Sequence, residues 1–378
     1  GSELLAYTNR MPPSTSTHSS LETESAEIHA AELRRKEDVR KIRQTYVNHG
    51  GITAEIVDYP IQVEIEKELT TAKETAAKFE REIASSLMLE MTGENLSDRI
   101  DVAKDLLADI VNSIIRNPDA MLLIRQLKDL DDLTYHHAMD VSIMLVSFGR
   151  QLGLPKKELN EIALGGLLHD IGKSRVPSEI INKKQRLNAE ETMAARSHVN
   201  LGLEVIAGLE NLSDIARQVI ERHHERYDGK GYPTGLAAED IGLYGSMAGI
   251  VETFSSITSD QPYSAARSSA QAVSTLVALR DSAFQSELVD QFIQVVGVYP
   301  IGSLVKLNTG EVGIVVKQNT MWRLKPMVSI VIDTEGRKLP SPMTIDLVRP
   351  PQLDAAPISI ATELPAGAYG IHARDYFL

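Results

Sequence analysis

The chain has 378 residues, 43% of them hydrophobic and 24% charged, which is typical of a soluble globular protein with two domains, or one large domain with appendages. Its formal net charge of −13 argues against nonspecific binding to DNA, which requires a basic surface. The chain has no cysteine, so disulfides and thiolate ligands are excluded and a metal site would use His, Asp and Glu. There is no apolar run of about 18 residues and no signal peptide, so we expect a cytoplasmic protein without membrane contact.

The first 95 residues are polar and are expected to lie outside the main domain. Residues 1–25 are predicted to be a disordered tail, because residues 11–25 are rich in Pro, Ser and Thr. Residues 26–95 are predicted to be a helical linker or the remnant of a regulatory region, with charged helices at 26–46 and 62–87. Two interpretations of the second helix stay open. The density of charge favours a solvated linker, and the alternative is a helix that forms a homodimer or contacts a signalling partner.

Residues 96–298 have apolar residues at helical spacing and are predicted to form one all-α domain. Its helices are expected at about 97–117, 120–130, 135–152, 157–170, 189–208, 212–225, 240–258, 265–283 and 284–297. Residues 299–350 change to alternating apolar and polar residues, which predicts a small β-rich extension with strands in SLVKL, EVGIVVKQ, MVSIVID and TIDLV. Residues 351–378 are predicted to be a loose tail. The fold class is therefore mainly α.

A set of potential metal ligands is distributed over the predicted helices of this domain. His169 and Asp170 lie in LLHDIGKSRVP, and further ligand types occur at about one site per helix, at His137, His198, His223, His224 and Glu252. A lone histidine is usually an ordinary core or surface residue. His136 is interpreted in that way, because a helix directs only one of two adjacent side chains at a given site. The joint pattern instead indicates a two-metal hydrolytic site for Fe, Mn, Zn or Ni.

The strings LLHDIGKSRVP and HHERYDGKGYPTGL resemble the HD-GYP family, a branch of the HD metal-dependent phosphohydrolases, over about residues 120–300. The resemblance implies a helical HD-type bundle, and residues 299–350 resemble an extension that follows some HD-GYP domains. It also implies a metal-dependent phosphodiesterase that hydrolyses a cyclic dinucleotide, with cyclic di-GMP as the expected substrate, to a linear dinucleotide or mononucleotides.

The family's functional positions fall on definite residues of this chain. The implied metal ligands are His137, His169, Asp170, His198, His223, His224 and Glu252. Members with a third metal have a glutamate where this chain has Leu133, so two divalent ions per chain are expected, Fe or Mn. The implied catalytic residues are Asp170 and Lys173. The implied substrate-binding residues are Lys173, Asp228, Lys230, Gly231, Tyr232 and Pro233.

The chain departs from the family pattern in the segment ETFSSITSDQPYS. Position 252 has glutamate in place of aspartate, and Ser255, Gln261 and Ser264 replace an aspartate, an arginine and a lysine. An arginine common in the family is Ser246 here, and Arg267 is a candidate to compensate for the lost cations. Two interpretations follow: an active enzyme with altered substrate preference, or a weak or inactive metal-binding domain that acts as a cyclic-dinucleotide sensor or protein-interaction module. The enzyme is favoured because the metal ligands and Lys173 are retained, and a helical scaffolding protein is disfavoured.

Overall fold

The computed structural model describes residues 21–48, 55–83, 96–127, 133–209, 211–262, 264–319, 322, 324–349 and 357–377. The chain separates into two compact units. The helical unit comprises Ile42–Arg267 and Leu279–Val295, and the sheet unit comprises residues up to Lys41, Ser268–Ala278 and Val296–Leu378. The predicted fold class, mainly α with a small β-rich part, is confirmed. Most of the predicted N-terminal tail lies outside the described residues.

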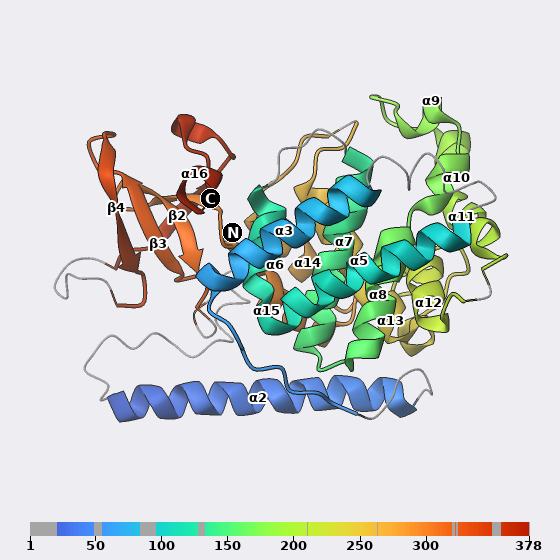
Figure 1. Ribbon diagram of the computed structural model, residues 1–378, viewed down its shortest axis with the longest axis horizontal. Helices are drawn as coiled ribbons and strands as arrows, with labels where there is room; N and C mark the ends of the chain where they lie inside the picture. The colour runs from blue at the N-terminus through green and yellow to red at the C-terminus, as the bar shows by residue number, and fades with distance from the viewer. Residues whose placement is uncertain are drawn as a thin grey trace. The chain divides into compact units, whose positions relative to one another are not determined.

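The helices agree with the predicted pattern in order, and several differ in length. Within the helical unit they are α3 (Ile65–Ile83), α5 (Leu96–Arg116), α6 (Pro118–Leu127), α7 (Leu133–Gln151), α8 (Lys156–Leu168), α9 (Ser178–Ile181), α10 (Ala189–Arg196), α11 (His198–Ile206), α12 (Asp214–Arg222) and α13 (Gly242–Thr258) (Figure 1). Two short 3-10 helices, η1 (Ile171–Arg175) and η2 (Ala238–Ile241), connect them. Four further helices among the described residues are α2 (Leu21–Asn48), α14 (Ser269–Ala278), α15 (Ser286–Val296) and α16 (Arg374–Phe377), and a third 3-10 helix is η3 (Ala368–Gly370). The single helix predicted at 189–208 is thus two helices, α10 and α11.

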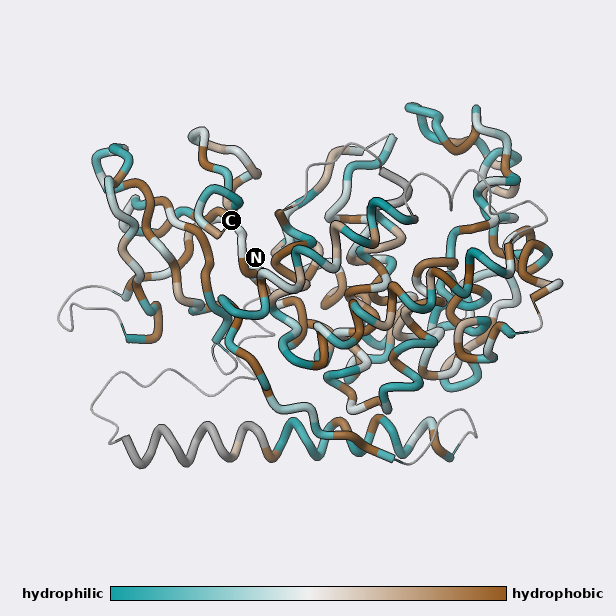
Figure 2. The backbone as a smooth tube through the Cα atoms, in the orientation of Figure 1, coloured by the Kyte–Doolittle hydropathy of each residue, from teal (hydrophilic) through white to brown (hydrophobic). Residues whose placement is uncertain are grey.

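Three helices form the centre of the helical unit. Helices α7 and α13 and the second half of α8 are apolar on nearly every side, and buried residues follow one another along each of them. A helix that is hydrophobic all round is stable only when other helices surround it. Helix α7 packs against α8 and α13, and α12 packs against both α8 and α13. Figure 2 shows the hydrophobic segments running through this part of the chain. The central helices therefore give rigid positions to any side chain at their ends.

Helix α3 belongs to this packing and is not a solvated linker. Its apolar face consists of Leu69, Ala72, Ala76 and Phe79, all buried, and it packs against α5 and α6. The buried carboxylate of Glu68 accepts hydrogen bonds from Arg116 at 2.7 and 2.8 Å. The favoured interpretation of the second N-terminal helix is therefore wrong. The sequence shows this helix to be amphipathic, but its charged face was given more weight than its apolar stripe.

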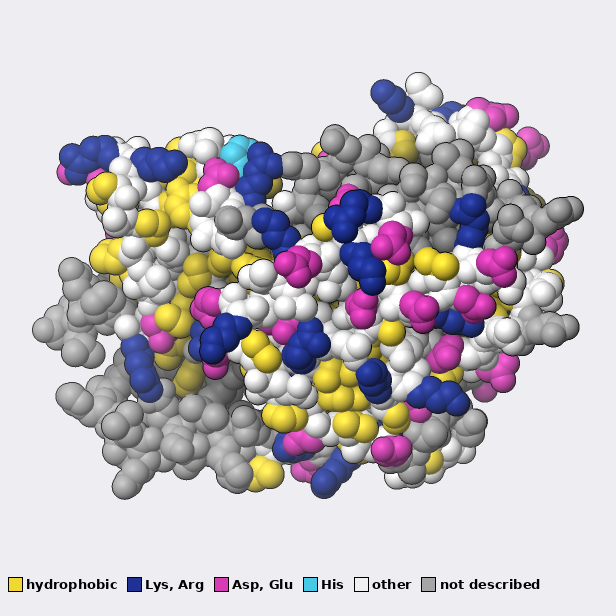
Figure 3. Space-filling model, in the orientation of Figure 1, with side chains coloured by type: hydrophobic (Ala, Val, Ile, Leu, Met, Phe, Trp, Pro, Cys, Tyr) yellow, Lys and Arg dark blue, Asp and Glu magenta, His cyan; other side chains and the backbone are white. Residues whose placement is uncertain are grey.

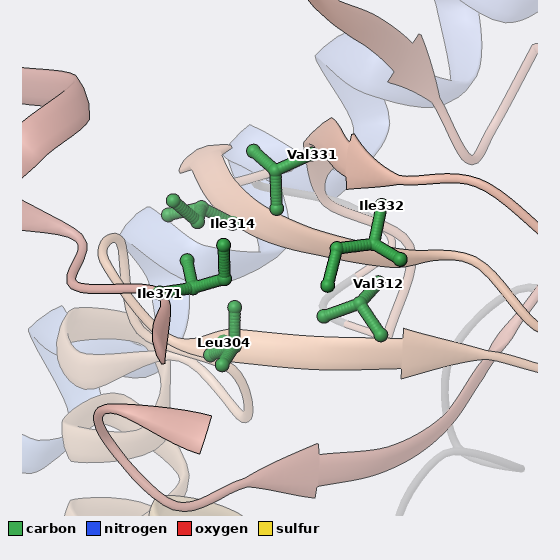
Figure 4. Close-up of a cluster of buried hydrophobic side chains, with 6 residues drawn as sticks. All are labelled: Leu304, Val312, Ile314, Val331, Ile332 and Ile371. Carbon is green, nitrogen blue, oxygen red and sulfur yellow. The ribbon is translucent and has the colours of Figure 1, made fainter. Parts of the chain in front are cut away.

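The sheet unit contains a five-stranded antiparallel sheet in the order β4-β3-β2-β1-β5. Its strands are β1 (Leu304–Leu307), β2 (Val312–Lys317), β3 (Met327–Ile332), β4 (Lys338–Asp346) and β5 (Ile360–Leu364). The prediction of a loose tail is wrong for residues 357–377, because β5 pairs with β1 and Ile371 enters the core of the sheet beside Leu304 and Ile314 (Figure 4). Strand β4 contains Pro340 and Pro342, which cannot donate ladder hydrogen bonds and are accommodated at an edge.

The surface shown in Figure 3 has lysine and arginine side chains interspersed with aspartate and glutamate. On that face the described residues of the two charge signs are mixed. Among the described helices, none has the length and apolar content required to cross a bilayer.

Candidate metal centre

The seven sequence-predicted metal ligands lie together in the helical unit. They come from five places in the fold: His137 from α7, His169 and Asp170 from the end of α8, His198 from the start of α11, His223 and His224 from the end of α12, and Glu252 from α13. Most of these positions are helix ends, where the chain changes direction and a side chain can be aimed inward. The packing of these helices thus brings together, at one site, ligands that are far apart in the sequence.

The ligands form two groups of three. In the first group the ligand atoms of His137, His169 and Glu252 lie within 4.8 Å of one another, and Glu252 Oε2 is 2.9 Å from His137 Nε2. In the second group the same limit holds for His198, His223 and His224. There the Nε2 atoms of His198 and His223 are only 3.3 Å apart. Each group has the donor types and the spacing that a first-row divalent cation requires.

Asp170 lies between the two groups and faces each of them with a different oxygen. Its Oδ2 atom is 3.3 Å from His169 Nε2 and 3.8 Å from His137 Nε2. Its Oδ1 atom is 3.4 Å from His198 Nε2 and 4.0 Å from His223 Nε2. A carboxylate placed in this way can bridge two cations, one on each oxygen.

Three buried atoms at this centre are not satisfied within the protein. Among the described residues, His169 Nε2, Asp170 Oδ1 and Glu252 Oε2 are buried and have no hydrogen-bond partner. Buried polar atoms are normally paired, because an unpaired one costs roughly 1–3 kcal/mol. All three belong to the predicted ligand set, and their donor chemistry suits a divalent cation. The residues therefore fit a metal centre.

The imidazoles are oriented by hydrogen bonds on their far side. The Nδ1–H groups of His169, His198 and His223 donate to the carbonyl oxygens of Gly166, Ala195 and Ile220, at 2.7, 2.7 and 2.9 Å. Each carbonyl lies three residues earlier in the chain. This arrangement places the proton on Nδ1 and directs the lone pair of Nε2 toward the centre, as metal-ligating histidines require.

The charge states also suit a cation. Burial lowers the pKa of His223 to about 3 and keeps the pKa values of His198 and His224 below their ordinary value, so these imidazoles are neutral ligands near pH 7. Burial would also lower the pKa of His169, but the Asp170 and Glu252 carboxylates outweigh it and raise that pKa to about 10, so a cation that binds here would displace a proton from the Nε2 atom of this imidazole. The pKa of each carboxylate is in turn held well below its ordinary value, against the effect of burial, chiefly by Lys173 and His169 for Asp170 and by His137 and His169 for Glu252.

Ser255 has a role in this centre that the sequence did not reveal. The sequence identified it only as the loss of a charged group, whereas the structure places its Oγ atom 3.1 Å from Nδ1 of His137. Ser255 is fully buried on α13, one turn after Glu252. The hydroxyl therefore orients the one imidazole of the first group that is not held by a backbone carbonyl.

We expect Ser255→Ala to weaken metal binding by about 10- to 100-fold, the usual effect of losing a hydrogen bond to a ligating histidine. Titration of the protein with Mn²⁺ against a competing chelator measures the change. Thr253→Val is the matched control, because the Thr253 hydroxyl lies on the same helix and donates to the carbonyl of Gly249 at 2.8 Å. Equal Mn²⁺ affinity for Ser255→Ala and the unaltered protein would contradict the assigned role.

The loop after α12 is held in place by a residue to which the sequence analysis assigned no role, although it belongs to the His-His-Glu string. The buried carboxylate of Glu225 accepts hydrogen bonds from the backbone N–H groups of Thr234, Gly235 and Leu236, at 2.8 to 3.1 Å. Gly231 lies so close to the backbone of Glu225 that a Cβ atom there would be 2.4 Å from Glu225 Cα. The only sequence signal for Glu225 was its place after the two histidines.

The predicted substrate-binding residues do not all reach the centre. The ring of Tyr232 stacks on His224, with centroids 4.5 Å apart, and Pro233 follows it in the loop. The Lys173 ammonium donates to Asp170 Oδ2 at 2.5 Å. Asp228 and Lys230, in contrast, pair with each other at 2.8 Å, and the Lys230 side chain is 84% exposed. The structure does not bring that pair into contact with the seven ligands.

The other positions that depart from the family pattern, besides Glu252 and Ser255, lie in a tight turn after α13 and in the first half of α13. Gln261 and Ser264 face each other, joined by backbone hydrogen bonds of 2.8 and 3.1 Å. Arg267 is exposed, and its proposed compensating role stays a prediction. The hydroxyl of Ser246 instead receives a hydrogen bond from Tyr46 of α2, at 3.3 Å.

Comparison with known proteins extends over most of the chain. A family model described as HD domain matches residues 109–288, and one described as KOW domain associated with HD domain matches residues 304–353. The chain is 34% identical, over 296 residues, to a cyclic di-GMP phosphodiesterase of Pseudomonas aeruginosa; the match covers 78% of this chain and 70% of that protein.

Two further relatives match over shorter segments. A cyclic di-GMP phosphodiesterase response regulator of Xanthomonas campestris is 33% identical over 145 residues, which is 38% of each chain. A 3'3'-cGAMP-specific phosphodiesterase of Vibrio cholerae is 25% identical over 244 residues, which is 63% of this chain and 43% of that protein. The chain thus spans most of the Pseudomonas relative and less than half of the other two.

Proposed function

The chain belongs to the HD-GYP family of HD-domain proteins, and we propose that it is a metal-dependent phosphodiesterase that hydrolyses a cyclic dinucleotide. The observation that carries this proposal is the position of Asp170 between two groups of metal ligands, with one oxygen toward each. The names of the relatives support a cyclic dinucleotide as the substrate and include both cyclic di-GMP and 3'3'-cGAMP. Cyclic di-GMP is the substrate that we propose first.

We assign two divalent ions, Fe or Mn, to the two groups. His137, His169 and Glu252 would hold one ion, and a second group, His198, His223 and His224, would hold the other, with Asp170 shared between them. Such a pair of ions supplies a hydroxide nucleophile near neutral pH and neutralises charge on a phosphate oxygen. The ligand atoms are oxygen and nitrogen only, which suits these metals.

The protein's own residues would then position the phosphodiester. Lys173 lies on η1, three residues after Asp170, and its side chain is 32% exposed, so its ammonium can meet both Asp170 and a phosphate at the surface of the centre. Positive charge there would stabilise the negative charge that develops on the phosphate oxygens during attack. The leaving group would be a ribose 3'-oxygen, which gives a linear dinucleotide.

The proposal is tested by incubating the full chain, loaded with Fe or Mn, with cyclic di-GMP, 3'3'-cGAMP and cyclic di-AMP. We expect metal analysis to find about two ions per chain, one for each ligand group. We expect at least one dinucleotide to be linearised, as followed by chromatography. If the metal-loaded protein cleaves none of them, the enzyme proposal is wrong.

One observation favours a second function, that of a sensor or interaction module. Gln261 and Ser264 form a neutral turn at positions where the family has two cations. The loss of these cations would weaken the binding of a negatively charged substrate. A sensor would bind a cyclic dinucleotide without cleaving it. Equilibrium binding measured beside cleavage distinguishes the two functions, because an enzyme binds and cleaves the dinucleotide whereas a sensor binds it and leaves it intact. A homodimer formed through the N-terminal helices, and signalling partners, stay predictions.

A further inference from the structure

A cyclic dinucleotide has two phosphodiesters, and a metal centre of this size can engage only one of them at a time. The second phosphate needs a positively charged partner elsewhere, and the family's arginine and lysine are replaced here by Gln261 and Ser264. The question is whether another cation lies at the edge of the centre.

Arg196 lies at such a position. It is the last residue of α10, which, with α9, projects from the rest of the helical unit, and it precedes His198 by two residues (Figure 1). The guanidinium Cζ atom is 4.8 Å from the ring centroid of Tyr232. That ring in turn stacks on His224 at 4.5 Å with an interplanar angle of 21°. A single aromatic ring therefore separates this exposed arginine from a candidate metal ligand.

The contact with Tyr232 leaves the hydrogen-bonding capacity of Arg196 unused. A cation–π contact uses the flat face of the guanidinium, whereas its five N–H donors point outward in the plane. Within the described part of the chain, no carboxylate or carbonyl oxygen receives a hydrogen bond or ion pair from Arg196, in contrast to Arg175, which pairs with Glu204 at 3.5 Å.

We propose that Arg196, held by the ring of Tyr232, binds the phosphate of the cyclic dinucleotide that is not being cleaved. The planar fork of an arginine matches two phosphate oxygens, and its weaker hydration favours stacked and partly buried contacts. Arg196 thus takes over the role of the cations missing at positions 261 and 264. This inference rests on the proposed substrate class, and Tyr232 acts in it as a positioning residue.

The test compares the full-length protein with Arg196→Gln. We expect the Kd for cyclic di-GMP, measured on protein treated with chelator to prevent turnover, to rise by about 10- to 100-fold, as for the loss of a charge-assisted hydrogen bond. In the metal-loaded protein KM should rise similarly while kcat changes less than about threefold, since the lost contact is remote from the reacting phosphate. Arg196→Lys keeps the positive charge but lacks the planar guanidinium with its paired N–H donors, so its Kd and KM should lie between those of the unaltered protein and Arg196→Gln.

Arg186→Gln is the matched control, because Arg186 is an exposed arginine on the same projecting segment and should leave Kd and KM unchanged. Metal content should be the same in all variants. A phosphate contact should weaken binding of cyclic di-GMP, 3'3'-cGAMP and cyclic di-AMP by a similar factor, because phosphates carry no base identity. A loss confined to the guanine-containing dinucleotides would show a base contact and overturn the proposal.

The outcomes separate this inference from the proposed function. If the unaltered protein cleaves a dinucleotide and Arg196→Gln binds it equally well, the Arg196 inference is wrong and the proposed enzymatic function is confirmed. If the protein binds dinucleotides but never cleaves them, and Arg196→Gln weakens binding to all of them equally, the proposed enzymatic function is wrong and the proposed phosphate contact is confirmed. If no dinucleotide binds with or without metal, the Arg196 inference is rejected as well.

Discussion

Replacement of Asp170 by asparagine will prevent the protein from binding its full number of metal ions and will abolish hydrolysis. The carboxylate faces one ligand group with Oδ2 and the other with Oδ1, at 3.3 and 3.4 Å from the nearest histidine nitrogens. Asparagine has one oxygen and no charge, so it cannot bridge two cations. We expect the metal content to fall from about two ions per chain to one or fewer. Turnover should fall by about 1,000-fold or more, which corresponds to roughly 4 kcal/mol of transition-state stabilisation.

The same variant should remain folded, which separates its effect from a loss of structure. Asp170 is a buried charge paired with Lys173 and His169, so its loss should lower the stability of the metal-free protein, whereas asparagine keeps the size and shape of the side chain. Thermal unfolding of the metal-free variant should therefore occur at a lower temperature but remain a single cooperative transition, which shows that the fold is kept. Asp101→Asn makes the same chemical change at an exposed surface ion pair with Lys104 and should keep both metal and turnover. If Asp170→Asn binds two ions and turns over substrate at the normal rate, Asp170 is not a ligand of the metal centre.

The metal centre could be predicted from the sequence to the extent that its residues lie in short motifs at helix ends. His169 with Asp170, and His223 with His224, occur as adjacent pairs, and the structure brings all seven predicted ligands together. Ser255 and Glu225 were given no role from the sequence, and neither was Arg196, for which we propose a phosphate contact, because such roles depend on which distant atom each residue meets. Ser255 matters through Nδ1 of His137, which lies 118 residues earlier in the chain.

Two of the errors in the fold, those on α3 and β5, have a similar physical origin. Helix α3 was interpreted as solvated because its charged residues outnumber the narrow apolar stripe that includes Ala72 and Phe79. Strand β5 was missed because it is a partly exposed edge strand without clear alternation, and it is defined mainly by its hydrogen bonds to β1. In both cases the partner determines the structure, and the partner cannot be read from the segment itself.

Gly172→Ala should be the most disruptive single-carbon change near the centre. Gly172 lies on η1, two residues after Asp170, and packs directly against α11. A Cβ atom at this position would be 1.9 Å from the carbonyl oxygen of His198 and 2.4 Å from the backbone nitrogen of Gly202. Both are backbone atoms of a helix, so they cannot move aside without shifting α11 as a whole.

We expect Gly172→Ala to lower the free energy of unfolding by about 3 kcal/mol, at the upper end for overpacking, as measured by denaturant unfolding of the metal-free protein. The shift of α11 should also separate His198 Nε2 from Asp170 Oδ1, now 3.4 Å apart, and reduce the metal content. Gly202→Ala is the matched control, since it lies across the same contact but its Cβ would meet its nearest atoms at 3.4 Å, an ordinary distance. Equal stability of the two variants would show that η1 and α11 are not packed as closely as described, because only the Gly172 variant places an atom inside the backbone of the neighbouring helix.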